Sequence, residues 1–171
     1  ILMALSQLEV TGAEVYATTV GNELTRRGHQ VFYVSDTLTK PTLGPVFRLR
    51  FNKRSILRRF WHVFYLIYLI RKHRIQLVHA HSRASGWSSY VACKLTGTPM
   101  ITTVHGRQPV HASRKAFHAL GYRAVAVCED IASQIIDNLG VDPAMVQVLR
   151  NGIETIDVEV LETHHLGVDL R

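Results

Sequence analysis

The sequence predicts an α/β domain with a doubly wound, Rossmann-like parallel sheet of about seven strands. Two observations support this prediction. Short strand-like segments alternate with longer helix-like segments, and the strand-like segments are apolar throughout rather than at every second residue. The 171 residues suit one domain, and a composition of 47% hydrophobic and 19% charged residues excludes disordered and collagen-like chains.

The first half of the chain begins with an apolar run, and a helix with small and apolar residues on one face follows it. Thr11 is a candidate N-cap for this helix, Glu14 would complete a capping box, and Gly28 would end the helix. A later segment alternates apolar residues with arginines, which indicates an edge strand or an extended loop. We expect strands at 1–6, 30–35 and 46–51 and helices at 12–27 and 55–73.

The helix expected at 55–73 has an apolar centre and basic residues at both ends. Its apolar run, 60–70, is too short to cross a bilayer, which needs ~20 residues. Because the centre is hydrophobic nearly all round, we expect this helix to be buried against the sheet. The alternative is that its basic ends let it lie on an anionic membrane surface.

The second half of the chain repeats the alternation of strand and helix. Glycines mark the ends of two of the helices, and two acidic residues open the last one, where the helix dipole favours negative charge. We expect strands at 75–80, 100–104, 124–128 and 146–149 and helices at 84–95, 109–120 and 129–139.

The charge is unevenly distributed along the chain. The formal net charge is +7, but no Asp or Glu occurs from Thr37 to Cys128, and 16 of the 20 Lys and Arg residues lie in that run. Phosphorylated small molecules, anionic lipid and nucleic acid are the candidate partners of such a block. We expect no nucleic acid, because there is no exposed pattern of interleaved aromatics and no known module. Paired catalytic carboxylates within the run are excluded.

Cys93 and Cys128 lie in apolar surroundings and outside any CxxC motif, so we expect reduced cysteines and a cytoplasmic protein, peripheral on the inner face of the membrane if the basic helix binds there. Residues 1–5 are apolar but lack the features of a secretory signal. The chain starts without Met, and we therefore expect it to be a fragment.

Polar, basic and glycine residues follow the expected strands, and in parallel α/β sheets ligands bind at the strands' carboxyl ends. Gly12 opens a helix, where free N–H groups and the helix dipole favour a phosphate, although a simple turn explains a lone glycine equally well. Neither a GxGxxG nor a GxxxxGK[ST] motif is present, which disfavours a dinucleotide fold and a P-loop.

Histidines stand out at two of these strand ends. His79 and His81 would share one face of a strand, but no third ligand is marked by spacing, so we expect no metal and favour hydrogen bonds within the loop. His105 precedes Gly106 at a strand tip, which leaves room for a substrate beside the imidazole, and it could hydrogen-bond a sugar hydroxyl or a phosphate. A purely structural role for His105 stays open.

Four stretches together resemble the N-terminal domain of the retaining glycosyltransferases of family 4, which have the GT-B fold. These are Thr11-Gly12-Ala13-Glu14 with the helix end at 24–31, then Val78-His79-Ala80-His81-Ser82, Thr103-Val104-His105-Gly106, and the segment 148–154 with Asn151-Gly152. Ala13 stands where the family has a second glycine, and Gln76 stands where it usually has Asp.

The resemblance implies roles for individual residues. His105 would be the catalytic residue that contacts the transferred sugar, and Gly12 would approach a phosphate or the acceptor. The substrate-binding residues would be Gly12, Ala13, Glu14, His81, Ser82, Arg83, Gly106, Arg107 and Asn151. It also implies that residues 1–154 form the acceptor-side domain and that 155–171 are a linker or the start of a donor-binding domain.

The resemblance further implies the reaction: transfer of a sugar, with retention, from a nucleotide-diphosphate sugar to a glycan or lipid-linked acceptor, as in cell-envelope glycan biosynthesis. No cofactor or metal would be needed, and we expect the chain by itself to be inactive. Two alternatives stay open. One is a non-catalytic module that binds a phosphorylated sugar or an anionic membrane, and the other is a GT-B sugar-nucleotide epimerase.

Overall fold

The computed structural model describes residues 1–6, 12–51, 55–81, 83–107 and 118–152. Within them lies one seven-stranded sheet, ordered β3-β2-β1-β4-β5-β6-β7, in which every neighbouring pair is parallel. The strands are β1 (Leu2–Ala4), β2 (Phe32–Ser35), β3 (Val46–Arg48), β4 (Val78–Ala80), β5 (Met100–Val104), β6 (Arg123–Ala126) and β7 (Val146–Val148). The predicted fold class is confirmed.

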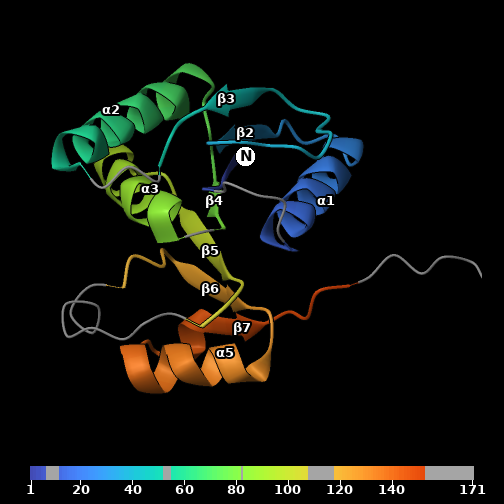
Figure 1. Cartoon of the computed structure of the whole chain (residues 1–171), viewed down its shortest axis with the longest axis vertical. Helices are drawn as coiled ribbons and strands as arrows, with labels where there is room; N and C mark the ends of the chain where they lie inside the picture. The colour runs from blue at the N-terminus through green and yellow to red at the C-terminus, as the bar shows by residue number, and fades with distance from the viewer. Residues whose placement is uncertain (7–11, 52–54, 82, 108–117, 153–171) are drawn as a thin grey trace, which may run out of the picture.

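The helices cover the sheet from both sides (Figure 1). They are α1 (Gly12–Arg26), α2 (Ile56–Lys72), α3 (Arg83–Thr96) and α5 (Glu129–Ser133), the last continuing as a π-helical turn at Gln134–Asn138, with a 3-10 turn at Pro143–Met145. The strand predicted at 146–149 and the helix predicted at 129–139 agree closely with the observed bounds. The helix expected at 109–120 falls mostly outside the described residues.

The alternation of side chains along β1 separates two cores. Leu2 and Ala4 pack with buried residues of α2 and α3, such as Leu66 and Ala92. Met3 and Leu5 face the other way and pack with Ala17 of α1. In Figure 1, accordingly, α2 and α3 lie side by side across the sheet from α1. A third core joins β5 and β6 to α5.

The register of the sheet decides which side its histidines face. Met3 is paired with His79, and paired residues of a parallel ladder point to the same side of the sheet. His79 therefore lies on the α1 side. The strand period of two carries His81 to the same side, as the H-x-H spacing predicts.

Two sequence predictions need correction. Helix α2 is buried against the sheet on one side only, through residues such as Val63 and Leu66, while Phe60, Trp61 and Phe64 are each more than half exposed. Glu14 forms no capping box within the described residues, since Oε1 of its carboxylate accepts hydrogen bonds from the loop after β2 instead. The predicted N-cap, Thr11, lies outside the described residues.

Candidate functional site

The candidate site lies at the carboxyl ends of β4 and β5, beside the first turns of α1. Three histidines gather there. Nε2 of His79 lies 2.8 Å from Oγ1 of Thr103, and the His79 and His81 rings are 4.0 Å apart between centroids. Nδ1 of His81 lies 3.4 Å from Nε2 of His105. The sequence thus brings residues from two strand ends into one row.

Tyr16 closes this row from the α1 side. Its ring centroid lies 5.2 Å from that of His105, edge to face, and 5.8 Å from that of His81. Aromatic pairs at such distances and angles attract each other beyond simple burial. Through Tyr16, helix α1 therefore helps to orient His81 and His105.

Burial keeps the histidine row uncharged at neutral pH. It lowers the pKa of His79 to about 4, with a smaller contribution from the nearby charge of His105, and it lowers the pKa of His105 to about 4. The pKa of His81 lies well below its ordinary value, first because of burial and then because of repulsion by the other two histidines. A neutral imidazole offers one donor and one acceptor nitrogen.

Two ring nitrogens of the row have no hydrogen-bond partner among the described residues. They are Nε2 of His81 and Nδ1 of His105, and both are shielded from solvent. Buried polar atoms in proteins are nearly always satisfied, so unpaired atoms need an explanation. His105 is the outermost of the three and is only partly buried.

Two predicted site glycines, Gly12 and Gly106, have open space at their Cα atoms. A Cβ atom added to Gly12 or to Gly106 would have no atom within 4 Å among the described residues, and both glycines are exposed. Ala13 is half-buried between Gly12 and Glu14. No described atom therefore occupies the position beside the Gly106 Cα, and the room for a substrate beside His105 stays a prediction.

The predicted substrate residue Glu14 has a structural role that the sequence did not reveal. It is 1% exposed, and its Oε1 accepts hydrogen bonds from the backbone N–H groups of Thr39 and Lys40 and from the Thr39 hydroxyl, at 2.6 to 2.9 Å. The carboxylate thereby holds the loop that follows β2 against the start of α1.

Two arginines at the strand ends are paired with the acids that open α5. Arg107 donates from Nε to Asp130 at 2.8 Å and makes a second contact with the same carboxylate from Nη2. Arg150 donates to Glu129 at 2.6 Å. Each pairing lowers the pKa of the acid and raises that of the arginine. Both pairs are exposed, so an anionic ligand can compete for the guanidinium groups.

The other predicted site residues are placed only in part. Asn151 is exposed just beyond β7, whereas Ser82 and the side chain of Arg83 lie outside what the structure describes. Sequence reasoning missed Tyr16, Thr103 and the acids of α5. Thr103 could have been found, because it stands two residues before His105 in a strand and so shares its face.

Other features lie away from this site. Within the described residues no group of three or more His, Cys, Asp or Glu side chains is arranged to hold a metal ion. A cavity of about 600 Å³ lies at the opposite, amino ends of β5 and β6, lined by residues such as Lys94, Met100 and Arg123. No described helix is both long and apolar enough to cross a bilayer.

Comparison with solved structures finds the same fold in one half of several longer chains. A glycosyltransferase from Rickettsia africae superposes with a TM-score of 0.77 at 22% identity, over 95% of this chain and 48% of that one. Anabaena HepE in complex with UDP and glucose gives 0.70 at 15% identity, over 97% and 50%. The UDP-N-acetylglucosamine 2-epimerase of Rickettsia bellii gives 0.65 at 13%, over 98% and 49%.

The sequence itself defines the family. The profile described as Glycosyltransferase Family 4 matches residues 10–156, so the chain belongs to this glycosyltransferase family, as its motifs predicted. Comparison with curated protein sequences gives no match. The chain spans about half the length of each of these three solved structures.

Proposed function

We infer that this chain is the acceptor-side half of a retaining glycosyltransferase that moves a hexose from a nucleotide-diphosphate sugar to a glycan or a lipid-linked acceptor. The observation that carries the proposal is the neutral, partly exposed His105 beside the open space at Gly106, in a chain of Glycosyltransferase Family 4. Solved structures of similar fold hold UDP and glucose, which supports a nucleotide sugar as the donor.

His105 is the residue we assign to the transferred sugar. Its Nδ1 has no described partner, and a pKa of about 4 keeps the ring uncharged at neutral pH. A neutral imidazole recognises a hydroxyl by one hydrogen bond and carries no charge that would attract the donor phosphates away from their place. His81 and Tyr16 would then act as positioning residues, since they hold the ring from two sides.

The start of α1 is the proposed place for negative charge. Gly12 and Ala13 lie in the first turn of a 15-residue helix, whose free N–H groups and dipole favour an anion. An anionic group there would be stabilised by preorganised donors, which is the usual way to stabilise a departing phosphate. The proposed binding set around the rim is completed by residues that follow the strands: His81, Ser82, Arg83, Gly106, Arg107 and Asn151.

The domain boundary after residue 154 belongs to the same proposal. The last described backbone hydrogen bond of the sheet runs from Leu149 N–H to the Ala126 carbonyl, directly after β7. Residues 155–171 would be a linker or the start of a donor-binding domain. The 171-residue chain alone is then expected to transfer no sugar.

A transfer assay on the product of the whole gene tests the function. It would use a panel of nucleotide-diphosphate sugars with glycan and lipid-linked acceptors, and nuclear magnetic resonance would report the anomeric configuration of the product. Retention is the expected outcome. His105→Ala should lower kcat by about 10²-fold, whereas the exposed His29→Ala at the opposite end of α1 should leave kcat unchanged. Full activity of His105→Ala, or turnover by the 171-residue chain alone, would contradict the assignment.

A sugar-nucleotide epimerase is the second candidate, because one solved structure of similar fold has that activity. The same experiment separates the two functions. An epimerase would convert one nucleotide sugar into another without any acceptor, whereas a transferase would release nucleotide only when an acceptor is present.

A further inference from the structure

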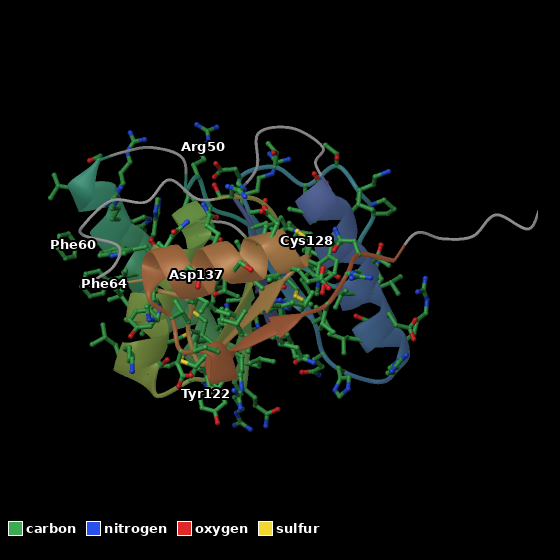
Figure 2. The ribbon with its side chains drawn as sticks, turned by 90° about the horizontal axis from the view of Figure 1, so that it is seen from below. Arg50, Phe60, Phe64, Tyr122, Cys128 and Asp137 are labelled. Carbon is green, nitrogen blue, oxygen red and sulfur yellow. The ribbon has the colours of Figure 1, made fainter. Side chains whose placement is uncertain are left out.

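The outward side of α2 carries a continuous apolar stripe, which we call the aromatic face. Its residues recur at helical spacing, and each is more than half exposed: Leu57 (81%), Phe60 (55%), Trp61 (65%), Phe64 (65%) and Tyr68 (51%). Figure 2 shows Phe60 and Phe64 at the outer edge of α2, pointing away from the rest of the chain. Such a stripe exposes on the order of 500 Å² of side chain, a size that marks an interaction surface.

The opposite side of α2 is already used. His62, Val63, Leu66, Leu69 and Ile70 are buried against the sheet and α3. The aromatic face is therefore not part of the core of the described fold. It needs an occupant from outside the described fold, because apolar area of this extent is unfavourable in water.

Basic residues frame the aromatic face, and acidic ones are absent from its part of the sequence. Arg58 and Arg59 lie in the first turns of α2 and Arg71 and Lys72 in the last, and all four are exposed. No Asp or Glu occurs from Thr37 to Cys128. Burial lowers the pKa of His62 and the charge of Asp36 opposes this shift, but His62 is on the buried side of α2 and not on the aromatic face. The four described salt bridges all lie elsewhere. A surface of this kind is complementary to a negatively charged partner.

Cationic side chains lie close to aromatic rings at the edge of the aromatic face and on the neighbouring helix. Nζ of Lys72 donates to the Tyr68 hydroxyl at 2.8 Å and lies 5.2 Å from the centre of the Tyr68 ring. Arg59 lies 5.8 Å from the ring of Trp87 on the neighbouring helix. Lys and Arg side chains whose aliphatic parts lie along an apolar surface, with their charged groups near aromatic rings, are typical of proteins at the boundary between the acyl chains and headgroups of a membrane.

The aromatic face begins on the same rim as the candidate site. Strand β3 ends at Arg48, and α2 starts a few residues later, whereas His81 and His105 follow the ends of β4 and β5 in the same parallel sheet. Arg50, exposed between β3 and α2, adds positive charge at this end (Figure 2). The first turn of α2 and the candidate site therefore lie at the same edge of the sheet, on opposite faces of it.

We propose that the aromatic face of α2 docks on an anionic lipid bilayer, with its rings in the headgroup boundary and its flanking arginines and lysine on the lipid phosphates. The helix lies in the plane of the membrane and does not cross it. The inference deepens the proposed function, because docking would present the rim to an acceptor held in the membrane. Only this consequence for the acceptor rests on the proposed function. The docking itself needs no transfer activity.

Sedimentation of the 171-residue chain with vesicles tests the docking without any sugar. The probes are phosphatidylcholine vesicles and vesicles in which about one third of the lipid is phosphatidylglycerol. Binding should be strong to the anionic vesicles only and should weaken as salt is added. Equal binding to both kinds of vesicle, or binding to neither, would overturn the proposal.

Two pairs of variants localise the surface. Phe60→Ser with Phe64→Ser should lower the partition coefficient at least tenfold, roughly what half-burial of two aromatic rings contributes, while Tyr122→Ser, equally exposed before β6, should change it little. Arg58→Gln with Arg71→Gln should lower it roughly fivefold per residue, while Lys40→Gln, exposed on the loop after β2, should not. Equal effects in variant and control would mean that another surface binds.

Tryptophan fluorescence gives a readout at α2 itself. The chain has two tryptophans, the exposed Trp61 and the half-buried Trp87. In Trp87→Phe, the remaining Trp61 should shift to shorter wavelength on anionic vesicles and be quenched by brominated lipid. In Trp61→Phe, the remaining Trp87 should shift much less. A Trp61 signal that vesicles leave unchanged would contradict the proposed orientation.

The remaining outcomes separate this inference from the proposed function. A dimer in solution that Phe60→Ser with Phe64→Ser dissociates would show that a second copy covers the face, and would overturn membrane docking. Vesicle binding by a protein whose whole-gene product transfers no sugar would support the docking and reject the proposed function. Sugar transfer without vesicle binding would support the proposed function and reject the docking.

Discussion

At the scale of single residues, the row of His79, His81 and His105 links folding to pH. Each imidazole has a pKa below its ordinary value because it is buried, so each would have to lose its proton before it could be buried at moderately acid pH. The unfolded chain, with ordinary histidines, binds more protons than the folded one between about pH 6.5 and pH 4. Stability in this window must therefore rise with pH.

We expect the free energy of unfolding to be highest above pH 6.5 and to fall as the pH approaches 4. His79 alone, whose folded pKa is about 4, should contribute a slope of up to about 1.4 kcal/mol per pH unit. Urea unfolding at several pH values would measure the slope. His79→Gln should reduce it and His29→Gln, exposed after α1, should not. A slope that His79→Gln leaves unchanged would contradict this account.

Glu14 should matter more for stability than its place in a proposed binding set indicates. Glu14→Ala would leave two backbone N–H groups and a hydroxyl without their acceptor, and we expect a loss of about 3 kcal/mol or more. Glu14→Gln keeps an acceptor oxygen and should cost less. Thermal unfolding with Glu23→Gln as a control, an exposed residue of the same helix, would measure this. Equal stability of Glu14→Ala and Glu23→Gln would be the contrary result.

The two thiols should differ in reactivity. Cys93 is buried, and burial raises the pKa of its thiol to about 12, whereas Cys128 is half-buried at the start of α5. Reaction with a thiol reagent at neutral pH should modify one cysteine in the native protein and the second only after unfolding. Mass spectrometry would identify which one reacts first. Rapid modification of Cys93 in the native protein would contradict the buried position.

At the scale of elements, the connection between β2 and β3 depends on a glycine. A Cβ at Gly44 would lie 1.9 Å from the carbonyl oxygen of Val31, which is backbone and cannot step aside. Gly44→Ala should therefore destabilise the protein by about 1–3 kcal/mol. Gly152→Ala, where a Cβ meets open space, should not change the midpoint of thermal unfolding. An unchanged midpoint for Gly44→Ala would mean that this connection adapts without cost.

The arrangement of elements was largely predictable from sequence because each strand is short, apolar and bounded by turn residues. The edge position of β3 was predictable too, since Arg48, and Arg50 just after the strand, are unfavourable in the middle of a sheet that is covered on both faces. The exposure of α2 was not. Its residues are apolar all round, and only the packing of Val63 and Leu66 decides which side meets the sheet.

The site was predictable in part for a similar reason. Period-two spacing placed His79 and His81 on one side, and position at a strand end placed His105 near them. The partners from other elements, Tyr16 on α1 and Asp130 on α5, depend on how distant segments meet. No local pattern of residues carries that information.

At the scale of the whole molecule, the proposed boundary after residue 154 predicts an independent folding unit. Among the described residues, every member of the three core clusters and every strand of the sheet lies before residue 150. A chain of residues 1–154 should therefore unfold cooperatively, with the same urea midpoint as the 171-residue chain. A midpoint shifted well outside experimental error would place part of 155–171 in this domain.

The central position of β1 has a consequence for how the chain reaches its native state. Leu2 lies beside Val78, and parallel strands cannot pair through a tight turn, so the middle of the sheet joins segments that are remote along the chain. Chains with such non-local pairing collapse to their final topology slowly. During synthesis the first strand emerges long before its second neighbour, and its apolar residues stay exposed meanwhile. Rapid dilution from denaturant should accordingly favour aggregation over recovery, and chaperones that shield nascent apolar segments should raise the yield.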